Sequence, residues 1–482
     1  MFLGINLSRQ LHRSDLVIIL AATACTAGLI FLINGFVTSR KKGRAPARSP
    51  SPQKRASVAS VSEKHDYTNT FPPVHQACFS GLVARGTDVK CIDLATTPKP
   101  LLRLDADYSQ ADPACFNFTG FSVADIRALG SFPDYARLSG VPLPSPLAEF
   151  NVDKALPRPY RPFRWPYHQT MSLSKLDADF WIELESTYRQ RIAQRQMLFK
   201  ENGRHVLESL PGSELACKEL MEMVLQFVVA RYPKQFSLDG CVLTNNILNT
   251  RTDLSATPPL ESLLNNIPED FGIMLRDPET GRYVLRAGVI CSSVGWKLSE
   301  KMGQGLPGIH KVVPDYKEKM EFSMDRFFTK MPTDKPIQRG SWGLEVGEPL
   351  FIPAEHPDFA HRSVQKPDLK PDGIFLRVDW QTLRRLPLSG AVVFNFKALF
   401  TPMTEFRNEP YIPSLILKVL EEGKENILKY KGTWHVEHVA KPALRDYVRF
   451  QVESGLIEED WAVQTLPDAP FFRDWERKWH VC

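Results

Sequence analysis

Two apolar runs separated by a short turn constrain the fold of this chain more than any other stretch. They are FGIMLRD at residues 271–277 and YVLRAGVICSS at residues 283–293, with PETGR between them. Apolar runs that end at a turn rich in Pro and Gly predict two paired strands. The second run alternates poorly between apolar and polar residues, which indicates a strand buried on both faces. The fold therefore needs a sheet with other elements packed against both of its sides.

Further strands and helices complete the expected core. Three later runs, SWGLEVG, GIFLRVDWQTLRRL and GAVVFNFKALFT, predict more strands between residues 341 and 401. Helical spacing predicts a helix that is capped by Asp177 or Asp179, contains Trp181 and Tyr188, and stops at Gly203. Other helices are expected at residues 213–230, 314–331, 411–430 and 442–455. Together these elements predict an α+β domain in which helices cover an antiparallel sheet.

An apolar segment near the start of the chain predicts a membrane anchor. Residues Leu16–Val37 contain no charged side chain and are long enough for one bilayer crossing, which takes roughly 20 residues. A cleaved signal peptide is the alternative, but its apolar core usually has only about 7–15 residues. Positive charges are denser at residues 40–48 than before the segment. This asymmetry predicts a single-pass membrane protein with its body in the cytosol. The expected location is the endoplasmic reticulum or another endomembrane.

Composition divides the chain into five parts. A short tail (1–15) precedes the transmembrane anchor (16–37), and a basic Ser/Pro tether (38–62) follows. The tether has almost nothing to bury, so it is expected to be disordered and to rest on membrane lipid. Residues 63–150 are rich in Pro and aromatic residues and are expected to pack as an extension on the patterned α+β domain of residues 151–482.

Charge and cysteine usage exclude several classes of site. Lys and Arg total 60 against 55 Asp and Glu, and no clustered basic face supports a nucleic-acid partner. The eight cysteines contain no CxxC pair and no zinc-site spacing, so reduced thiols are favoured, although a disulfide within Cys78, Cys91 and Cys115 stays open. A Gly-rich phosphate loop, a GxSxG elbow and an HExxH helix are also missing from the sequence, which excludes the familiar nucleotide and hydrolase modules.

One histidine lies on a stiff segment after the second strand of the hairpin. His310 stands between Pro307 and Pro314, and each proline ring fixes its own backbone dihedral. Haem needs a neutral imidazole on its iron, basic or polar groups for its propionates and an apolar slot for the porphyrin. His310 meets the first need by its position. Candidates for the second need follow on the later strands and turns: Arg339, Trp342, Arg377, Arg384 and Arg385.

The residue pattern leaves other interpretations open. A lone loop histidine is more often a surface residue than a ligand, and arginines near Trp and Asp are more often structural. His356, His361, His435 and His438 are rivals to His310, and the last two are three residues apart, a spacing that places both on one side of a helix turn. Spacing alone does not choose among these histidines.

A series of short segments between Tyr160 and Asp446 carries a resemblance to a known family. In chain order the segments are YRPFRWPYHQTM, DADFWIELESTYRQRIAQR, LPGSE, ARYP, PEDFGIML, VICSSVGWKLSEKMGQGLPGIHKVVP, the FF of DRFFTKM, QRGSW, LRVDWQTLRRLP and YKGT. With them the chain resembles the haem-dependent oxidative N-demethylase alpha-subunit-like family, formerly a domain of unknown function. The anchor, the tether and residues 63–150 lie outside the resemblance.

The resemblance implies a PAS-like fold that encloses haem b and uses it for catalysis. It implies oxidative N-demethylation of a small amine, with electrons from NADPH through a separate reductase that holds flavin and an iron–sulfur centre. It favours His310 as the axial metal ligand, with His168 as the runner-up, and makes Arg339 and Arg377 candidate cofactor-binding residues.

Two further residues are candidates for catalysis, and two functions remain open. An ammonium substrate would need an aromatic face or a carboxylate, and Trp296 and Glu300 lie near His310 in the sequence. The expected function is a membrane-tethered haem-dependent monooxygenase that releases formaldehyde. The alternative is a non-catalytic PAS-like sensor or scaffold at the membrane that binds haem or a small ligand. Turnover of an amine distinguishes the two.

Overall fold

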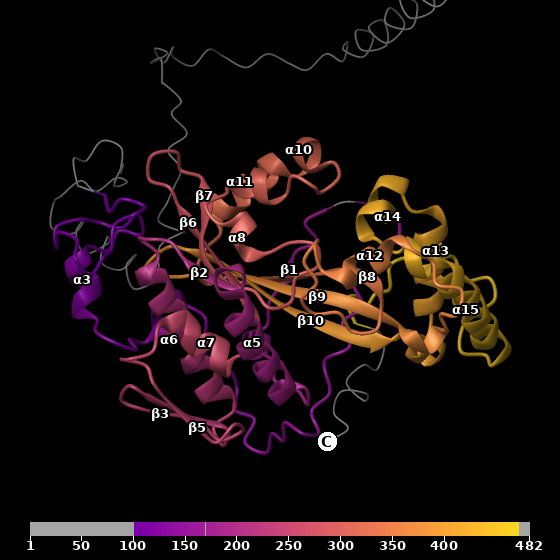
Figure 1. Ribbon diagram of the computed structural model, residues 1–482, viewed down its shortest axis with the longest axis horizontal. Coiled ribbons are helices and arrows are strands. Elements are labelled where there is room, and N and C mark those ends of the chain that lie inside the picture. Colours follow the sequence, from indigo (N-terminus) through magenta and orange to yellow (C-terminus); the bar gives the residue numbers. More distant parts are fainter. Residues whose placement is uncertain (1–100, 169, 472–482) are drawn as a thin grey trace, which may run out of the picture. The chain divides into compact units, whose positions relative to one another are not determined.

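The computed structural model describes residues 101–168 and 170–471. The central strands are β1 (Ser174–Lys175), β2 (Leu207–Ser209), β6 (Asp270–Arg276), β7 (Tyr283–Val289), β8 (Ile337–Val346), β9 (Ile374–Arg385) and β10 (Val392–Pro402). They form one antiparallel sheet in the order β1-β8-β9-β10-β6-β7-β2 (Figure 1). The predicted hairpin is β6–β7, and the prediction of an α+β fold with an antiparallel sheet is confirmed.

Three helices cover one face of this sheet: α5 (Tyr188–Asn202), α6 (Glu214–Arg231) and α7 (Pro259–Asn266) (Figure 1). Alternation along the strands decides which side chains meet them, because successive residues point to opposite faces. In β6, Phe271 and Ile273 belong to the large core with these helices, whereas Met274 belongs to a smaller core on the other face.

The other face of the sheet carries the connection from β7 to β8. This connection contains four short helices, α8 (Leu298–Lys301), α9 (Leu306–Ile309), α10 (Tyr316–Lys319) and α11 (Glu321–Lys330). Their buried side chains pack with Met274, Leu285 and Val392 of the sheet to form the smaller core. The single helix expected at residues 314–331 is divided at Met320, whose backbone leaves helical geometry.

The remaining elements flank these layers. Helices α12 (Pro357–Ala360), α13 (Ile412–Glu422), α14 (Glu425–Lys431) and α15 (Trp434–Glu453) gather at one end of the long strands β9 and β10 (Figure 1). A small antiparallel sheet of β3 (Phe236–Asp239), β4 (Val242–Asn245) and β5 (Thr250–Asp253) was not predicted. Within residues 101–168, the helices α3 (Val123–Ala128) and α4 (Tyr135–Ser139) precede the main sheet.

The first predicted helix begins later than its sequence pattern indicates. Asp177 caps a short 3-10 turn at Ala178–Phe180, and α5 starts only at Tyr188. Between them, the Glu183 carbonyl accepts a bond from Lys397 Nζ at 2.6 Å, and the Glu183 N–H donates to a Glu269 carboxylate oxygen at 2.9 Å. Distant residues thus satisfy backbone groups that a helix would have paired internally. The predicted stop is confirmed, because Gly203 ends α5 with φ +51°.

The prediction of a transmembrane helix has to be corrected, and with it that part of the predicted fold class and the predicted membrane localisation. Within residues 101–168 and 170–471, no helix is both long and apolar enough to cross a membrane. The long helix α6, for example, contains Glu214, Lys218 and Arg231, whereas a crossing takes roughly 20 mainly apolar residues. The segment Leu16–Val37, on which the prediction of a single-pass membrane protein rested, lies outside the described residues.

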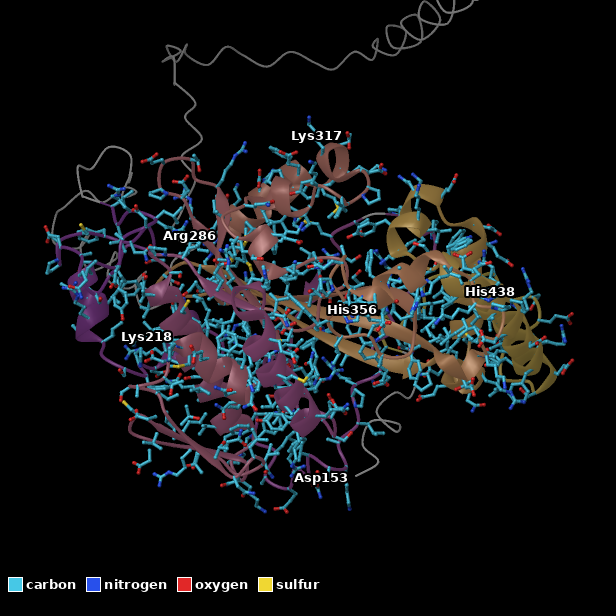
Figure 2. The ribbon with its side chains drawn as sticks, viewed as in Figure 1. Asp153, Lys218, Arg286, Lys317, His356 and His438 are labelled. Carbon is cyan, nitrogen blue, oxygen red and sulfur yellow. The ribbon has the colours of Figure 1, made fainter. Side chains whose placement is uncertain are left out.

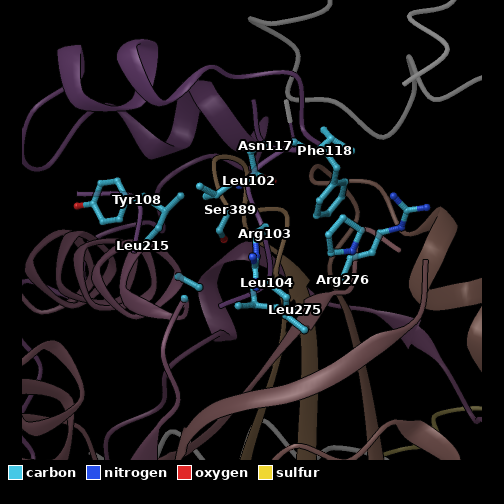
Figure 3. Close-up of a pocket in the computed structure, with 14 residues that line it drawn as sticks. Leu102, Arg103, Leu104, Tyr108, Asn117, Phe118, Leu215, Leu275, Arg276 and Ser389 are labelled. Atoms are coloured by element: carbon cyan, nitrogen blue, oxygen red, sulfur yellow. The ribbon is translucent and has the colours of Figure 1, made fainter. Parts of the chain in front are cut away.

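The part of the extension that the structure describes, residues 101–150, packs against α6 and the β9–β10 turn. The Thr119 hydroxyl donates to the Leu388 carbonyl at 2.8 Å, and the Tyr135 hydroxyl donates to the Glu222 carboxylate at 2.7 Å. A cavity of about 50 Å³ lies between this segment and the body, with Leu104 and Leu215 among its lining residues (Figure 3). That volume holds a few water molecules at most.

Gly212 is the point where this packing tolerates no side chain. Its φ is +86°, and a Cβ at this position would lie 2.0 Å from the Leu104 carbonyl oxygen. We expect Gly212→Ala to lower the free energy of unfolding by about 3 kcal/mol or more, because backbone strain and a clash add. Gly130→Ala is the matched control, since Gly130 has φ +71° and open space around it. Equal losses in denaturant unfolding of the two variants would contradict the prediction.

Candidate functional site

A cavity of about 320 Å³ lies between the main sheet and helices α8–α11. Strands β6 to β10 contribute side chains to its floor, and residues from 164–168 and 170–172 together with α14 line further sides. Its wall is largely apolar and includes Met274, Leu285, Ile290, Leu298, Leu306, Ile309, Val313, Met320, Met324, Phe328, Phe394 and Phe396. A mainly apolar cavity of a few hundred cubic ångströms with a few polar groups is typical of a small-molecule or cofactor site.

His310 lies in the wall of this cavity, directly after α9. Its ring Nδ1 is 2.8 Å from the Leu306 carbonyl oxygen. A carbonyl only accepts, so Nδ1–H donates and the neutral ring keeps a lone pair on Nε2. Burial is the main cause that lowers the pKa of His310, and the positive charges of Arg339 and Lys301 lower it further. The imidazole is therefore neutral at pH 7 and offers one nitrogen to a metal.

Four cationic side chains line the cavity, and no carboxylate is among the described residues that do so. The cations are Arg164, Lys301, Arg339 and Lys431. Burial lowers the pKa of Lys431 to about 7, and the nearby charges of Arg339 and Arg164 contribute to this shift. Burial also lowers the pKa of Arg339, again with a contribution from Arg164. These mutual effects show that the basic side chains of Arg164, Arg339 and Lys431 lie near one another, where they favour an anionic ligand group.

Arg339 shows this excess of positive charge most directly. Its strand β8 pairs with β9 so that Arg339 stands opposite Gln381, and both side chains line the cavity. The Nε of Arg339 is buried without a hydrogen-bond partner in the part of the chain that the structure describes. Burying a cation without a partner is unfavourable. An acceptor oxygen of a bound ligand could satisfy this donor, because the side chain lines the cavity.

The structure brings four of the predicted site residues to this cavity. Trp296, His310 and Arg339 line it, and His168 lines it from an exposed position. His168 and His310 thus lie on different segments of one site, but only His310 is held by a hydrogen bond from its ring among the described residues.

Two predicted site residues lie outside the cavity. Glu300 is exposed, and its carboxylate accepts the backbone N–H of Lys297 at 3.1 Å at the start of α8. Arg377 is buried and donates to the carbonyl oxygens of Pro349 at 2.5 Å and Ser292 at 2.6 Å. Both side chains are engaged in holding loops in place.

The alternative arginines and histidines are also placed away from the cavity. Arg385 donates to the carbonyl oxygen of Met331 at 2.5 Å and so fastens the end of α11. Arg384 stacks on Trp181 at 4.0 Å. His435 and His438 lie on α15, and Figure 2 shows His438 among helices α13–α15.

Two of the cationic cavity residues, Arg164 and Lys431, were not singled out from the sequence. Both stand inside segments that carry the family resemblance, YRPFRWPYHQTM and YKGT. Their position within such a segment was the only feature of the sequence that could have marked them as site residues. Neither segment reveals that the two side chains meet, because more than 250 residues separate them in the chain.

The low pKa of Lys431 predicts a pH-dependent stability of the ligand-free protein. The unfolded chain keeps this lysine protonated up to a pKa near 10.4, whereas the folded chain releases the proton near pH 7. Between these values the unfolded chain binds more protons, so the contribution of Lys431 to stability becomes more favourable as the pH rises. Lys431→Met should therefore stabilise the protein at pH 7, and this gain should shrink towards pH 10.

Urea unfolding of both proteins at pH 7, 8.5 and 10 measures this difference. Lys317→Met removes an exposed lysine on α10 and is the control (Figure 2). Its difference from the wild type should stay constant over the same range. A pH-independent effect of Lys431→Met would contradict the prediction.

Comparison with known protein families agrees with the resemblance seen in the sequence. The model of a family described as haem-dependent oxidative N-demethylase, alpha subunit-like, matches residues 172–441. The matched region includes β6–β10, α8–α11 and α14, and therefore His310, Arg339 and Lys431. Arg164 and His168 precede it. Because the match extends over more than half of the 482 residues, the chain belongs to the haem-dependent oxidative N-demethylase alpha-subunit-like family.

Proposed function

We propose that this protein is a haem-dependent monooxygenase that demethylates a small amine by oxidation and releases formaldehyde. The observation that supports it most strongly is the neutral imidazole of His310 in the wall of a mainly apolar cavity. The family to which the chain belongs is described as haem-dependent oxidative N-demethylase, alpha subunit-like, which supports the proposal at the level of the family.

The residues of the cavity fit haem b in three respects. His310 would hold the iron through Nε2, which stays unprotonated while Nδ1–H donates to Leu306. The apolar wall suits the porphyrin, and the cluster of Arg164, Arg339 and Lys431 provides the positive charges that two propionates need. The buried, unpartnered Nε of Arg339 is the observation that tests this fit. When bound, the haem would supply iron that activates molecular oxygen.

The protein itself would supply orientation and a water-poor site. Phe394 and Phe396 extend from β10 into the cavity wall, and Trp296 lines it from the segment before α8. Their ring faces attract the positive end of a methylammonium group. Glu300 does not line the cavity, so we assign recognition of the amine to these aromatic faces.

Electrons in this proposal come from NADPH through a separate reductase with flavin and an iron–sulfur centre. One molecule of oxygen, two electrons and two protons are consumed as the N-methyl group is oxidised. One oxygen atom leaves in formaldehyde and the other in water, and the amine nitrogen keeps a proton in place of the methyl group. Support for this part comes from the family resemblance.

Haem titration followed by a turnover assay tests the proposal. The full chain is titrated with haem, and then incubated with NADPH, a ferredoxin, its reductase and a panel of N-methyl amines. The expected result is a Soret band that saturates at one haem per chain, and formaldehyde in equal amount to the demethylated amine. A missing band overturns the proposal. A saturable band without formaldehyde from any amine would instead indicate a haem-binding sensor.

A further inference from the structure

The imidazole of His310 and the phenol ring of Tyr316 are stacked. Their centroids are 4.9 Å apart, and the ring planes differ by only 5°. The hydrogen bond from Nδ1 to the Leu306 carbonyl holds one ring atom, but it allows the ring to tilt about that contact. A flat neighbour against the ring face removes this freedom. The two contacts together determine both the position and the plane of the imidazole.

A tight turn between the two rings brings them together. The Val313 N–H donates to the His310 carbonyl at 2.9 Å, and the Tyr316 N–H donates to the Val313 carbonyl at 3.3 Å. Asp315, just before Tyr316, has φ +56°, a left-handed conformation that is uncommon outside glycine. Its carboxylate pairs with Lys319 and accepts a bond from Asn426 of α14 at 3.4 Å. These contacts hold the strained backbone and direct Tyr316 towards His310.

The ring of Tyr316, and not its hydroxyl, makes this contact. The residue is 5% exposed, and its hydroxyl is buried without a hydrogen-bond partner among the described residues. Tyr316 does not line the cavity, so it reaches a ligand there only through His310. A phenylalanine at this position would keep the flat face and remove a polar group that has no partner.

We propose that Tyr316 is a positioning residue that fixes the plane of the His310 imidazole and thereby sets the axial bond to the haem iron. The inference rests on the proposed function, because it needs His310 as the ligand. Groups that orient a ligating histidine typically change metal affinity by roughly 10- to 100-fold when they are removed. Tyr316 would act in this way through ring stacking.

Three variants test the proposal in the full chain. Tyr316→Leu removes the flat face, Tyr316→Phe keeps it, and Phe327→Leu removes an aromatic ring from the same small core without a recorded ring contact to His310. The measurements are the haem dissociation constant, the midpoint potential and the electron paramagnetic resonance spectrum of the ferric haem. Thermal unfolding of each haem-free variant reports whether the fold is intact.

Tyr316→Leu should weaken haem binding about tenfold, shift the midpoint potential and broaden the resonance spectrum. Tyr316→Phe should retain wild-type values in all three measurements, and Phe327→Leu should retain the wild-type spectrum. Wild-type values in Tyr316→Leu, or the same shifts in Phe327→Leu, would overturn the proposal. Should Tyr316→Leu fail to fold, an altered spectrum in Tyr316→Phe would overturn it. If His310→Ala keeps the wild-type haem spectrum, the proposed function itself fails, and these two failures are therefore distinguishable.

Discussion

Replacement of His310 by alanine should abolish the specific Soret band of the haem-loaded protein and weaken haem binding by more than about 100-fold. The reason is that His310 offers the unprotonated nitrogen for the iron, fixed by its Nδ1–H bond to Leu306 and neutral at pH 7 because burial lowers its pKa. The change removes no polar partner that another side chain needs, so the fold should survive. Absorption titration with haem and circular dichroism measure these two properties.

His168→Ala is the matched control for this experiment. His168 lines the same cavity, but it is exposed, and no hydrogen bond of its ring is recorded among the described residues. We expect a wild-type Soret band in this variant. Free imidazole added to His310→Ala should restore much of the band, since the mutation leaves space where the ring was. A normal band in His310→Ala, or a lost band in His168→Ala, would refute the assignment of the ligand.

Replacement of Arg339 by methionine should have opposite effects on stability and on haem binding. Without a ligand, the variant should be more stable by about 1–2 kcal/mol, because it no longer buries a cation whose Nε has no partner. Haem affinity should fall roughly 10- to 100-fold, because a hydrogen bond to a charged group contributes about 1.5–3 kcal/mol. Urea unfolding of the haem-free protein and haem titration measure the two effects.

Arg384→Met is the control for this experiment. It separates the general effect of removing a buried arginine from an effect on haem binding in the cavity. Arg384 is buried in the same sheet, its Nε also lacks a partner among the described residues, and burial lowers its pKa to about 9. It does not line the cavity. This variant should therefore leave haem affinity unchanged. A parallel loss of affinity in both variants would show that the effect of Arg339 is not local.

The elements that the sequence predicted well are those with a strong local signal. The hairpin β6–β7 and the long strands β9 and β10 follow from apolar runs between turns, and Gly203 ends its helix as expected. The predicted start of α5 was wrong because the side chains of Lys397 and Glu269 form hydrogen bonds with the backbone of Glu183. Both partners are distant in the sequence, so a local pattern does not reveal them. The transmembrane helix was corrected, and its segment lies outside the described residues.

The sequence by itself determined the antiparallel α+β fold, the family and a histidine between two prolines as a candidate ligand. Only the tertiary structure decided which side chains surround that histidine. Arg164, Arg339 and Lys431 come from three distant segments. They line one cavity because β8 carries Arg339 and Ser341 along its wall, and Lys431 at the end of α14 donates to the Ser341 hydroxyl at 3.2 Å. Tyr316 reaches His310 through a left-handed turn at Asp315. Apolar periodicity fixes which face of an element is buried, but the packing of whole faces against one another fixes which polar residues become neighbours.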